Sequence, residues 1–230
     1  MRKIGLIGGL SWYSTRTYYE HINRGVQARS GGKASAPMLI ESLDFSNLVR
    51  LSSAEDWKRA GEILSASAFR LETAGATAIL IGANSMHKVY DAVAGSVSVP
   101  ILHIADCVAD RMVKDKVKKA ALLGTRNVML ESFYRQKLVA RDIELVPPDL
   151  ERVEVLDQII YDELIIGKAT RHAERELKTI ITNLEKEGAE AIVLGCTELE
   201  MVVDVDANVL PIYDCTEIHA HAAIDWILGE

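Results

Sequence analysis

A cysteine that follows a short apolar run is the side chain in this sequence best placed to do chemistry. The run Ala191–Leu194 reads as a buried strand, and Gly195 turns the chain so that Cys196 stands where a helix should begin. In open α/β sheets, ligands bind at the carboxyl ends of parallel strands. A helix N-terminus lowers the pKa of a thiol and attracts carboxylates. The position therefore predicts an acid/base or nucleophilic thiol beside a carboxylate ligand, with a small buried apolar role as the alternative.

The same pattern occurs in the first half of the chain. Residues 75–82, Gly-Ala-Thr-Ala-Ile-Leu-Ile-Gly, align without a gap with residues 188–195, Gly-Ala-Glu-Ala-Ile-Val-Leu-Gly. This alignment predicts two copies of one unit whose loops face one another, with Ala83 at the position of Cys196. One copy therefore carries a thiol after its strand, and the other carries a methyl group.

Composition and charge narrow the class of protein. The 230 residues include 26 Lys and Arg against 33 Asp and Glu, and no basic run is long enough for a nucleic-acid partner. The 3 cysteines are unevenly spaced and form no Cys-x-x-Cys pair, which favours neither disulfides nor a zinc site. No stretch approaches the roughly 20 apolar residues of a membrane span. We therefore expect a cytoplasmic protein that binds a small molecule and holds no metal.

Strands alternate with helices along the whole chain, which predicts an α/β fold with parallel sheets covered on both faces. We expect a first domain at residues 1–97 plus 211–230 and a second at residues 98–210. A glycine-rich turn follows the first strand at Gly8-Gly9, but it lacks the G-x-G-x-x-G spacing of a dinucleotide site. No nucleotide cofactor is therefore expected.

Four motifs are spread along the chain: Ile4-Gly-Leu-Ile-Gly-Gly-Leu-Ser-Trp12, Asn84-Ser-Met-His-Lys-Val89, Ala121-Leu-Leu-Gly-Thr-Arg126 and Gly195-Cys-Thr-Glu198. Together they resemble the motifs of the cofactor-independent aspartate/glutamate racemase family, with aspartate racemases and broad-specificity amino-acid racemases as the nearest members. The resemblance implies two Rossmann-like domains related by a pseudo-twofold axis, with the active site between them. It also implies a homodimer that racemises free amino acids without pyridoxal phosphate or metal.

The resemblance further implies a mechanism in which two acid/base groups flank the α-carbon, one removing the α-proton and the other returning a proton. One group maps onto Cys196, and the other maps onto Ala83, where some relatives carry Thr. Alanine cannot carry a proton, so three possibilities stay open. The chain is an active racemase, a one-thiol lyase or decarboxylase of the same fold, or an amino-acid-binding form without turnover. Whether Ala83 is native or replaces the base also stays open.

Other candidate site residues are donors for the charged groups of an amino acid. Asn84 and Ser85 at one expected helix start, and Thr197 at the other, are expected to hold the α-carboxylate. Glu198 would orient Thr197 or accept a hydrogen bond from the ammonium group. Ser11 and Thr125 are weaker candidates, because hydroxyls in turns usually cap helices.

The sequence gives little sign of a clamp for an acidic side chain. Lys168 could reach one from a loop, but no arginine lies at residues 41–45. His87 could substitute for the missing base, although a histidine satisfied within the core is the alternative. His219 and His221 are two residues apart on an expected helix and point away from each other, so they suggest no metal site.

Overall fold

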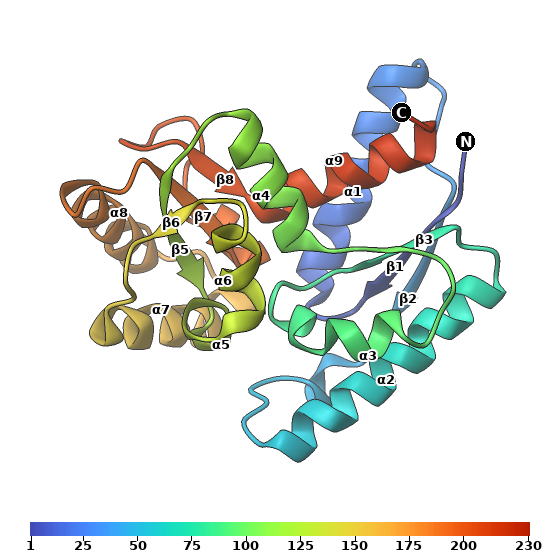
Figure 1. Cartoon of the computed structure of the whole chain (residues 1–230), viewed down its shortest axis with the longest axis horizontal. Coiled ribbons are helices and arrows are strands. Elements are labelled where there is room, and N and C mark those ends of the chain that lie inside the picture. The colour runs from blue at the N-terminus through green and yellow to red at the C-terminus, as the bar shows by residue number, and fades with distance from the viewer. The chain divides into compact units, whose positions relative to one another are not determined.

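The computed structural model describes residues 1–230, which form two compact units (Figure 1). Residues 1–104 and 219–230 make up the first unit, and residues 105–218 make up the second. Each unit contains one four-stranded sheet in which every strand pair is parallel. The expected α/β class with two parallel sheets is therefore confirmed.

The first unit has the strand order β2-β1-β3-β4. Its elements are β1 (Ile4–Gly8), α1 (Trp12–Ser30), β2 (Met38–Ser42), the 3-10 helix η1 (Phe45–Asn47), α2 (Ala54–Thr73), β3 (Ala78–Ile81), the 3-10 helix η2 (Ser85–Val89), α3 (Tyr90–Ala94), β4 (Ile101–Leu102) and most of α9 (Cys215–Leu228).

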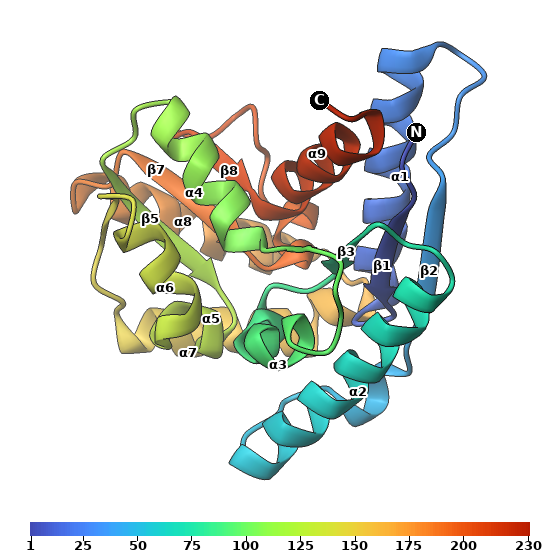
Figure 2. The same ribbon diagram turned by 45° about the vertical axis from the view of Figure 1, so that its right-hand side comes forward.

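Alternate residues of β3 point to opposite faces of the first sheet. Ile79 and Ile81 pack in the apolar cluster formed with α2, whereas Ala78 and Leu80 pack in the cluster formed with α1 and α9. Figure 2 shows α1 and α9 side by side and α2 apart from them. A strand covered on both faces has no polar side, which explains why residues 78–81 are uniformly apolar.

Helix α2 shows how local sequence sets the ends of an element. The Ser53 side chain accepts the Asp56 N–H, and the Asp56 carboxylate accepts the Ser53 N–H, so a reciprocal capping box starts the helix. Beyond its C-terminus, Gly75 adopts a φ of +94°, which favours glycine. Between these ends, Leu64, Ala68 and Leu71 recur at helical spacing and are buried.

The second unit repeats the topology of the first, with the strand order β6-β5-β7-β8. Its elements are α4 (Ile104–Lys114, whose first residue still belongs to the first unit), β5 (Lys119–Gly124), α5 (Arg126–Leu130), α6 (Ser132–Val139), β6 (Glu144–Leu145), α7 (Leu150–Asp162), the 3-10 helix η3 (Leu164–Ile166), α8 (Arg171–Lys186), β7 (Ala191–Gly195), the 3-10 helix η4 (Thr197–Met201), β8 (Ile212–Asp214) and the start of α9.

The boundaries of the units differ from the expected 1–97 plus 211–230 and 98–210. Strand β4 pairs with β3 in the first sheet, so residues 98–104 belong to the first unit. Strand β8 pairs with β7 in the second sheet, so residues 211–218 belong to the second unit. The chain therefore crosses from one unit to the other after residue 104 and returns after residue 218.

None of the helices combines the length and the apolar character that crossing a membrane would require.

Candidate active site

The candidate residues lie where the winding of each sheet changes direction. In the first sheet, β2 lies on one side of the β1–β3 pair and β4 on the other, and in the second sheet β6 and β8 flank the β5–β7 pair in the same way. Ligands bind outside the carboxyl ends of the strands at such a switch point. Ser11 and Asn84 follow β1 and β3, and Thr125 and Cys196 follow β5 and β7.

Glycines at the ends of β3 and β7 bring the adjacent strands close together. A Cβ at Gly82 would lie 2.9 Å from the carbonyl oxygen of Ile7, and a Cβ at Gly195 would lie 3.1 Å from that of Leu123. The first distance is too short for any larger residue without a shift of the backbone, and at Gly195 the added Cβ would also lie 2.8 Å from Cγ1 of Val128. The two glycines that align in the repeat therefore serve the same steric purpose, directly before Ala83 and Cys196.

The edge of the first sheet holds buried polar atoms without hydrogen-bond partners. Asn84 is 3% exposed, and neither its side-chain oxygen nor its nitrogen has a partner within the protein. Ser11 is 4% exposed, its hydroxyl is unpartnered, and its φ of +87° is unusual for a residue with a side chain. Buried polar groups are nearly always hydrogen-bonded, and backbone strain gathers at functional sites. Both observations indicate a ligand site at this edge, next to Ala83 and the half-buried Ser85.

Helix capping does not account for these hydroxyls. Ser11 and Thr125 stand at the N-caps of α1 and α5, but neither side chain makes a capping hydrogen bond. In the turn before α1, the Thr15 hydroxyl makes the side-chain hydrogen bond instead, and it accepts the Gly9 N–H at 2.7 Å. The Thr125 hydroxyl is buried and has no partner in the protein. The capping alternative for Ser11 and Thr125 is therefore wrong.

At the edge of the second sheet, Cys196, Thr197 and Glu198 form one buried group. The Cys196 thiol donates to Glu198 Oε2 at 3.2 Å, and the Thr197 hydroxyl donates to the same oxygen at 2.7 Å. Glu198 thus accepts hydrogen bonds from both side chains and orients them, including Thr197 as expected.

The environment raises the pKa of Cys196 instead of lowering it. Burial raises this pKa well above its ordinary value, and the nearby Glu198 carboxylate raises it further. The expected compensation from a helix N-terminus is weak, because η4 is a single short 3-10 helix and its dipole is small. The expectation of a lowered thiol pKa is therefore wrong, and Cys196 is a neutral thiol in the resting protein.

The other thiols lie in less suitable places. Cys215 is fully buried and hydrogen-bonded to the Tyr134 hydroxyl at 2.9 Å, and burial raises its pKa. Burial also raises the pKa of Cys107, in the first turn of α4, to about 12.

The three histidines and the lysine considered for the site lie in different environments. His87 uses both ring nitrogens on backbone groups, Nδ1 with the Ala83 carbonyl at 2.9 Å and Nε2 with the Ile104 N–H at 3.2 Å, so it is satisfied within the core. His219 is buried and His221 is exposed, as expected for residues that point apart. Lys168 is exposed and lies two residues beyond η3, a segment that contacts η4.

Sequence reasoning missed a second Cys-Thr pair at the same edge. Strand β8 pairs with β7, with Asp214 beside Leu194, so Cys215 and Thr216 follow β8 as Cys196 and Thr197 follow β7. Asp214 accepts the Thr216 N–H at 2.7 Å, and the buried Thr216 hydroxyl has no partner. The repeated order of a strand, Cys and Thr was the signal that could have identified this pair.

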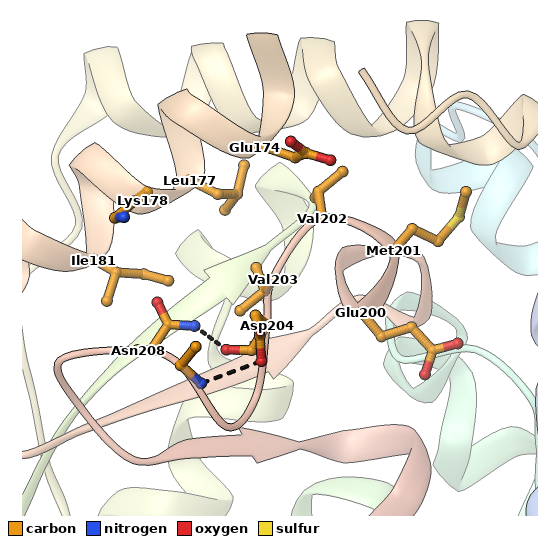
Figure 3. A pocket seen from close by; sticks show the side chains of 11 residues that line it. Glu174, Leu177, Lys178, Ile181, Glu200, Met201, Val202, Val203, Asp204 and Asn208 are labelled. Atoms are coloured by element: carbon orange, nitrogen blue, oxygen red, sulfur yellow. Dashed lines mark hydrogen bonds between the residues drawn. The ribbon is translucent and has the colours of Figure 1, made fainter. Parts of the chain in front are cut away.

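A separate cavity of about 440 Å³ lies in the second unit, between α8 and residues 200–208 (Figure 3). Three acidic side chains and Lys178 line it together with apolar side chains, and Asn208 donates to the backbone of Asp204. Cys196, Thr197 and Glu198 are not among its lining residues. The cavity is therefore distinct from the candidate active site.

Comparisons with known proteins agree with the geometry. The model of the Asp/Glu/hydantoin racemase family matches residues 7–223. The crystal structure of a candidate Asp/Glu racemase from Yersinia pestis is 39% identical with a TM-score of 0.90, covering 99% of this chain and 100% of that one. An aspartate racemase homologue from Pyrococcus horikoshii OT3 is 34% identical with a TM-score of 0.85 and covers 99% and 100%. The broad-specificity amino-acid racemase RacX of Bacillus subtilis (strain 168) is 25% identical over 162 residues, 70% of each chain.

This two-sheet α/β protein belongs to the Asp/Glu/hydantoin racemase family.

Proposed function

We propose that this protein is a racemase of free amino acids that needs no pyridoxal phosphate, with Cys196 as the acid/base group on one side of the α-carbon. The supporting observation is the set of buried, unpartnered polar groups of Ser11, Asn84 and Thr125 at the two switch points, one of which also carries the Cys196 thiol. Leaving such groups buried and unpaired costs about 1–3 kcal/mol each. A ligand with a carboxylate and an ammonium group would satisfy them.

In this proposal, each strand edge supplies donors for the α-carboxylate of the substrate. These donors are Asn84 and Ser85 after β3 and Thr125 after β5, together with Thr197 once its hydroxyl turns from Glu198 to the substrate. This carboxylate gains negative charge when the α-proton leaves, so fixed donors stabilise the transition state more than the ground state. Family membership and the matching topology of the two sheets support this arrangement.

Glu198 links substrate binding to the state of Cys196. Burial is the main reason that the pKa of Cys196 is high, and the Glu198 carboxylate, which accepts the thiol hydrogen bond, raises it further. A substrate ammonium beside Glu198 would offset that negative charge and favour the thiolate. The base would then form only when a substrate is bound.

A one-thiol lyase is the second candidate function. Ala83 supplies no proton on its side, and the neutral Cys196 thiol is already a proton donor in the resting protein. These two facts favour one-sided protonation of a carbanion, as in a decarboxylase. An amino-acid-binding form without turnover remains if neither reaction occurs.

We propose that specificity is not restricted to Asp or Glu. No arginine lies at residues 41–45, and Lys168 is exposed and forms no ion pair in the structure. Neutral and small polar amino acids should bind at least comparably to aspartate. Calorimetry across such a panel checks this, and strict preference for acidic substrates would assign Lys168 or another cation to the distal carboxylate.

The central test is exchange of the α-hydrogen in deuterated buffer across a panel of amino acids. We expect exchange by the unmodified protein and a loss of about 100- to 10,000-fold in Cys196→Ser, because a positioned acid/base group contributes that much. Cys107→Ser is the control, since it removes a thiol from the first turn of α4. Full exchange in Cys196→Ser would contradict the proposal, and carbon dioxide release from malonate derivatives without exchange would favour the lyase.

A further inference from the structure

Two buried histidines of the first unit hold the short segment between β4 and α4. The Ile104 N–H donates to His87 Nε2 at 3.2 Å, and His219 Nε2 donates to the Leu102 carbonyl at 2.9 Å. The chain leaves the first unit directly after Ile104 and re-enters it at His219. Both chain crossings therefore lie next to this pair of histidines.

The hydrogen bonds of His87 define its tautomer. Because the Ile104 N–H is a donor, Nε2 carries no proton, and the ring proton resides on Nδ1. Nδ1 then donates to the Ala83 carbonyl at 2.9 Å. The neutral ring, 1% exposed, thus connects the loop after β3 with the start of α4.

The Ala83 carbonyl is part of the peptide plane that joins Ala83 to Asn84. A hydrogen bond that fixes this carbonyl also fixes the direction of the Asn84 N–H and limits where the Asn84 side chain points. That side chain is buried without a partner of its own, so no hydrogen bond of its amide orients it. The orientation of Asn84 must come from the backbone and from packing.

We propose that His87 is a positioning residue for the first-unit half of the active site. It holds the Ala83–Asn84 peptide in the orientation that presents Asn84 to the substrate carboxylate, and it ties this peptide to the point where the chain leaves the unit. The inference rests on the proposed function, because it assigns Asn84 to substrate. It differs from a catalytic role for His87, since both ring nitrogens are already occupied by the backbone.

The remaining contacts of the cluster extend this connection to α1. The Tyr18 hydroxyl donates to His219 Nδ1 at 2.8 Å, and the rings of His87 and His219 lie 5.9 Å apart in an edge arrangement. The ring of His103 lies 4.7 Å from that of His87. These contacts give a matched control, because the Tyr18 hydroxyl supports His219, whose other ring nitrogen binds the Leu102 carbonyl.

Three substitutions at His87 separate its two hydrogen bonds. The amide of His87→Asn can occupy the position of Nδ1 and keep the bond to Ala83, and the longer His87→Gln can occupy the position of Nε2 and keep the bond to Ile104. His87→Leu loses both. Tyr18→Phe removes one buried hydrogen bond of the cluster and leaves the Ala83 loop intact.

The measurements are kcat and KM for α-deuterium exchange, the melting temperature, and hydrogen exchange of the peptide covering residues 82–86. We expect His87→Leu and His87→Gln to lower kcat about 10- to 100-fold, since small misplacements of a binding group cost that much, and to speed amide exchange in residues 82–86. His87→Asn should retain most of kcat at a melting temperature similar to that of His87→Gln. Tyr18→Phe should lower the melting temperature with kcat unchanged.

Equal kcat in His87→Asn and His87→Gln, or full kcat in His87→Leu, would overturn the inference and leave His87 a purely structural residue. Amide exchange of residues 82–86 is measured without substrate. If the unmodified protein exchanges no amino acid, the proposed function fails, whereas unchanged amide exchange in His87→Leu is a failure of the inference itself.

Discussion

The Cys196 thiol donates a hydrogen bond to the Glu198 carboxylate, and this contact bears on when the thiol can act as a base. The thiol lies 3.2 Å from the carboxylate oxygen, and both residues are buried. Burial and the carboxylate both favour the protonated thiol. A base of this kind is weak at neutral pH until a positive charge enters the site.

The first prediction is therefore an alkaline pH dependence. Because the pKa of Cys196 is raised, the thiolate fraction of the free protein increases throughout the alkaline range, and kcat/KM for α-proton removal should increase with it. Glu198→Gln removes the carboxylate charge and should shift this rise to lower pH, while KM increases because the ammonium loses its acceptor. Rates of α-deuterium exchange as a function of pH provide the measurement.

Glu200→Gln is the control for that experiment, since it removes from the same 3-10 helix a carboxylate whose side chain hydrogen-bonds Asp214. A profile that stays flat across the neutral and alkaline range would show that Cys196 is not the titrating base.

Residue-level chemistry was only partly predictable from the sequence. The position of Cys196 after a buried strand followed from the apolar run and the glycine, since both act locally. Its pKa did not, because burial and the Glu198 carboxylate are properties of the folded site. The same holds for Ser11 and Thr125, whose sequence context suggests caps and whose buried hydroxyls are unpartnered.

At the scale of elements, two helix glycines have opposite surroundings. In α1, a Cβ at Gly25 would lie 2.1 Å from Cδ1 and 3.0 Å from Cγ1 of Ile224 in α9. In α2, a Cβ at Gly61 would meet its nearest atoms at 3.7 Å, which is ordinary van der Waals contact. The first glycine allows close helix packing, and the second is replaceable.

We predict opposite effects on the free energy of unfolding. Gly61→Ala should stabilise by about 0.5–1 kcal/mol, because alanine is the better helix former. Gly25→Ala should destabilise by about 1–3 kcal/mol, because overpacking against the buried Ile224 exceeds that gain. Ile224→Val removes Cδ1 and should restore part of the loss in the double variant. Urea unfolding of the unmodified protein, the two glycine variants and the double variant gives the result. A stabilising Gly25→Ala would mean that α9 shifts to accept the added methyl group at little cost.

Strands and long helices were the part of the fold that local patterns could predict. The capping box of α2 and the apolar run of β3 are encoded within a few neighbouring residues. The short strands β4 and β8 could not be assigned to the correct unit, since only pairing with β3 and β7 decides it. Such pairings depend on residues far away in the chain.

At the scale of the whole molecule, one buried histidine ties stability to pH. Burial lowers the pKa of His219 from 6.5 to about 3, and the neighbouring His87 contributes in the same direction. At pH values between these two pKa values, His219 binds a proton in the unfolded chain and stays neutral in the folded protein. The contribution of His219 to the free energy of unfolding is therefore fully present above its pKa in the unfolded chain. It is lost as the pH falls toward its pKa in the folded protein.

We predict that the free energy of unfolding decreases by up to about 1.4 kcal/mol per pH unit within this window because of His219. His219→Gln cannot titrate but can still donate to the Leu102 carbonyl, so it should flatten the slope. The control is His221→Gln, on the exposed side of the same helix. Denaturant unfolding at several acidic pH values measures the slope, and an unchanged slope in His219→Gln would assign the acid sensitivity to other groups.

The matching topology of the two sheets leads to the last prediction. Strands β3 and β7 hold equivalent places in their sheets, and the aligned glycines Gly82 and Gly195 are followed by Ala83 and Cys196. In a two-base reaction, the unmodified chain would exchange the α-hydrogen of one enantiomer through Cys196 and invert it slowly, because Ala83 carries no proton. Ala83→Cys should then raise racemisation about 100- to 10,000-fold.

Ala83→Ser is the matched control for that substitution, because it adds a side chain of similar size whose hydroxyl is a far weaker acid than a thiol. It should therefore leave inversion slow. Chiral chromatography follows inversion while deuterium incorporation follows proton removal, so the two steps are measured separately in each variant. Rapid inversion by the unmodified chain would mean that another group supplies the second proton. A gain in Ala83→Cys but not in Ala83→Ser would show that the missing thiol alone separates this chain from a two-base racemase.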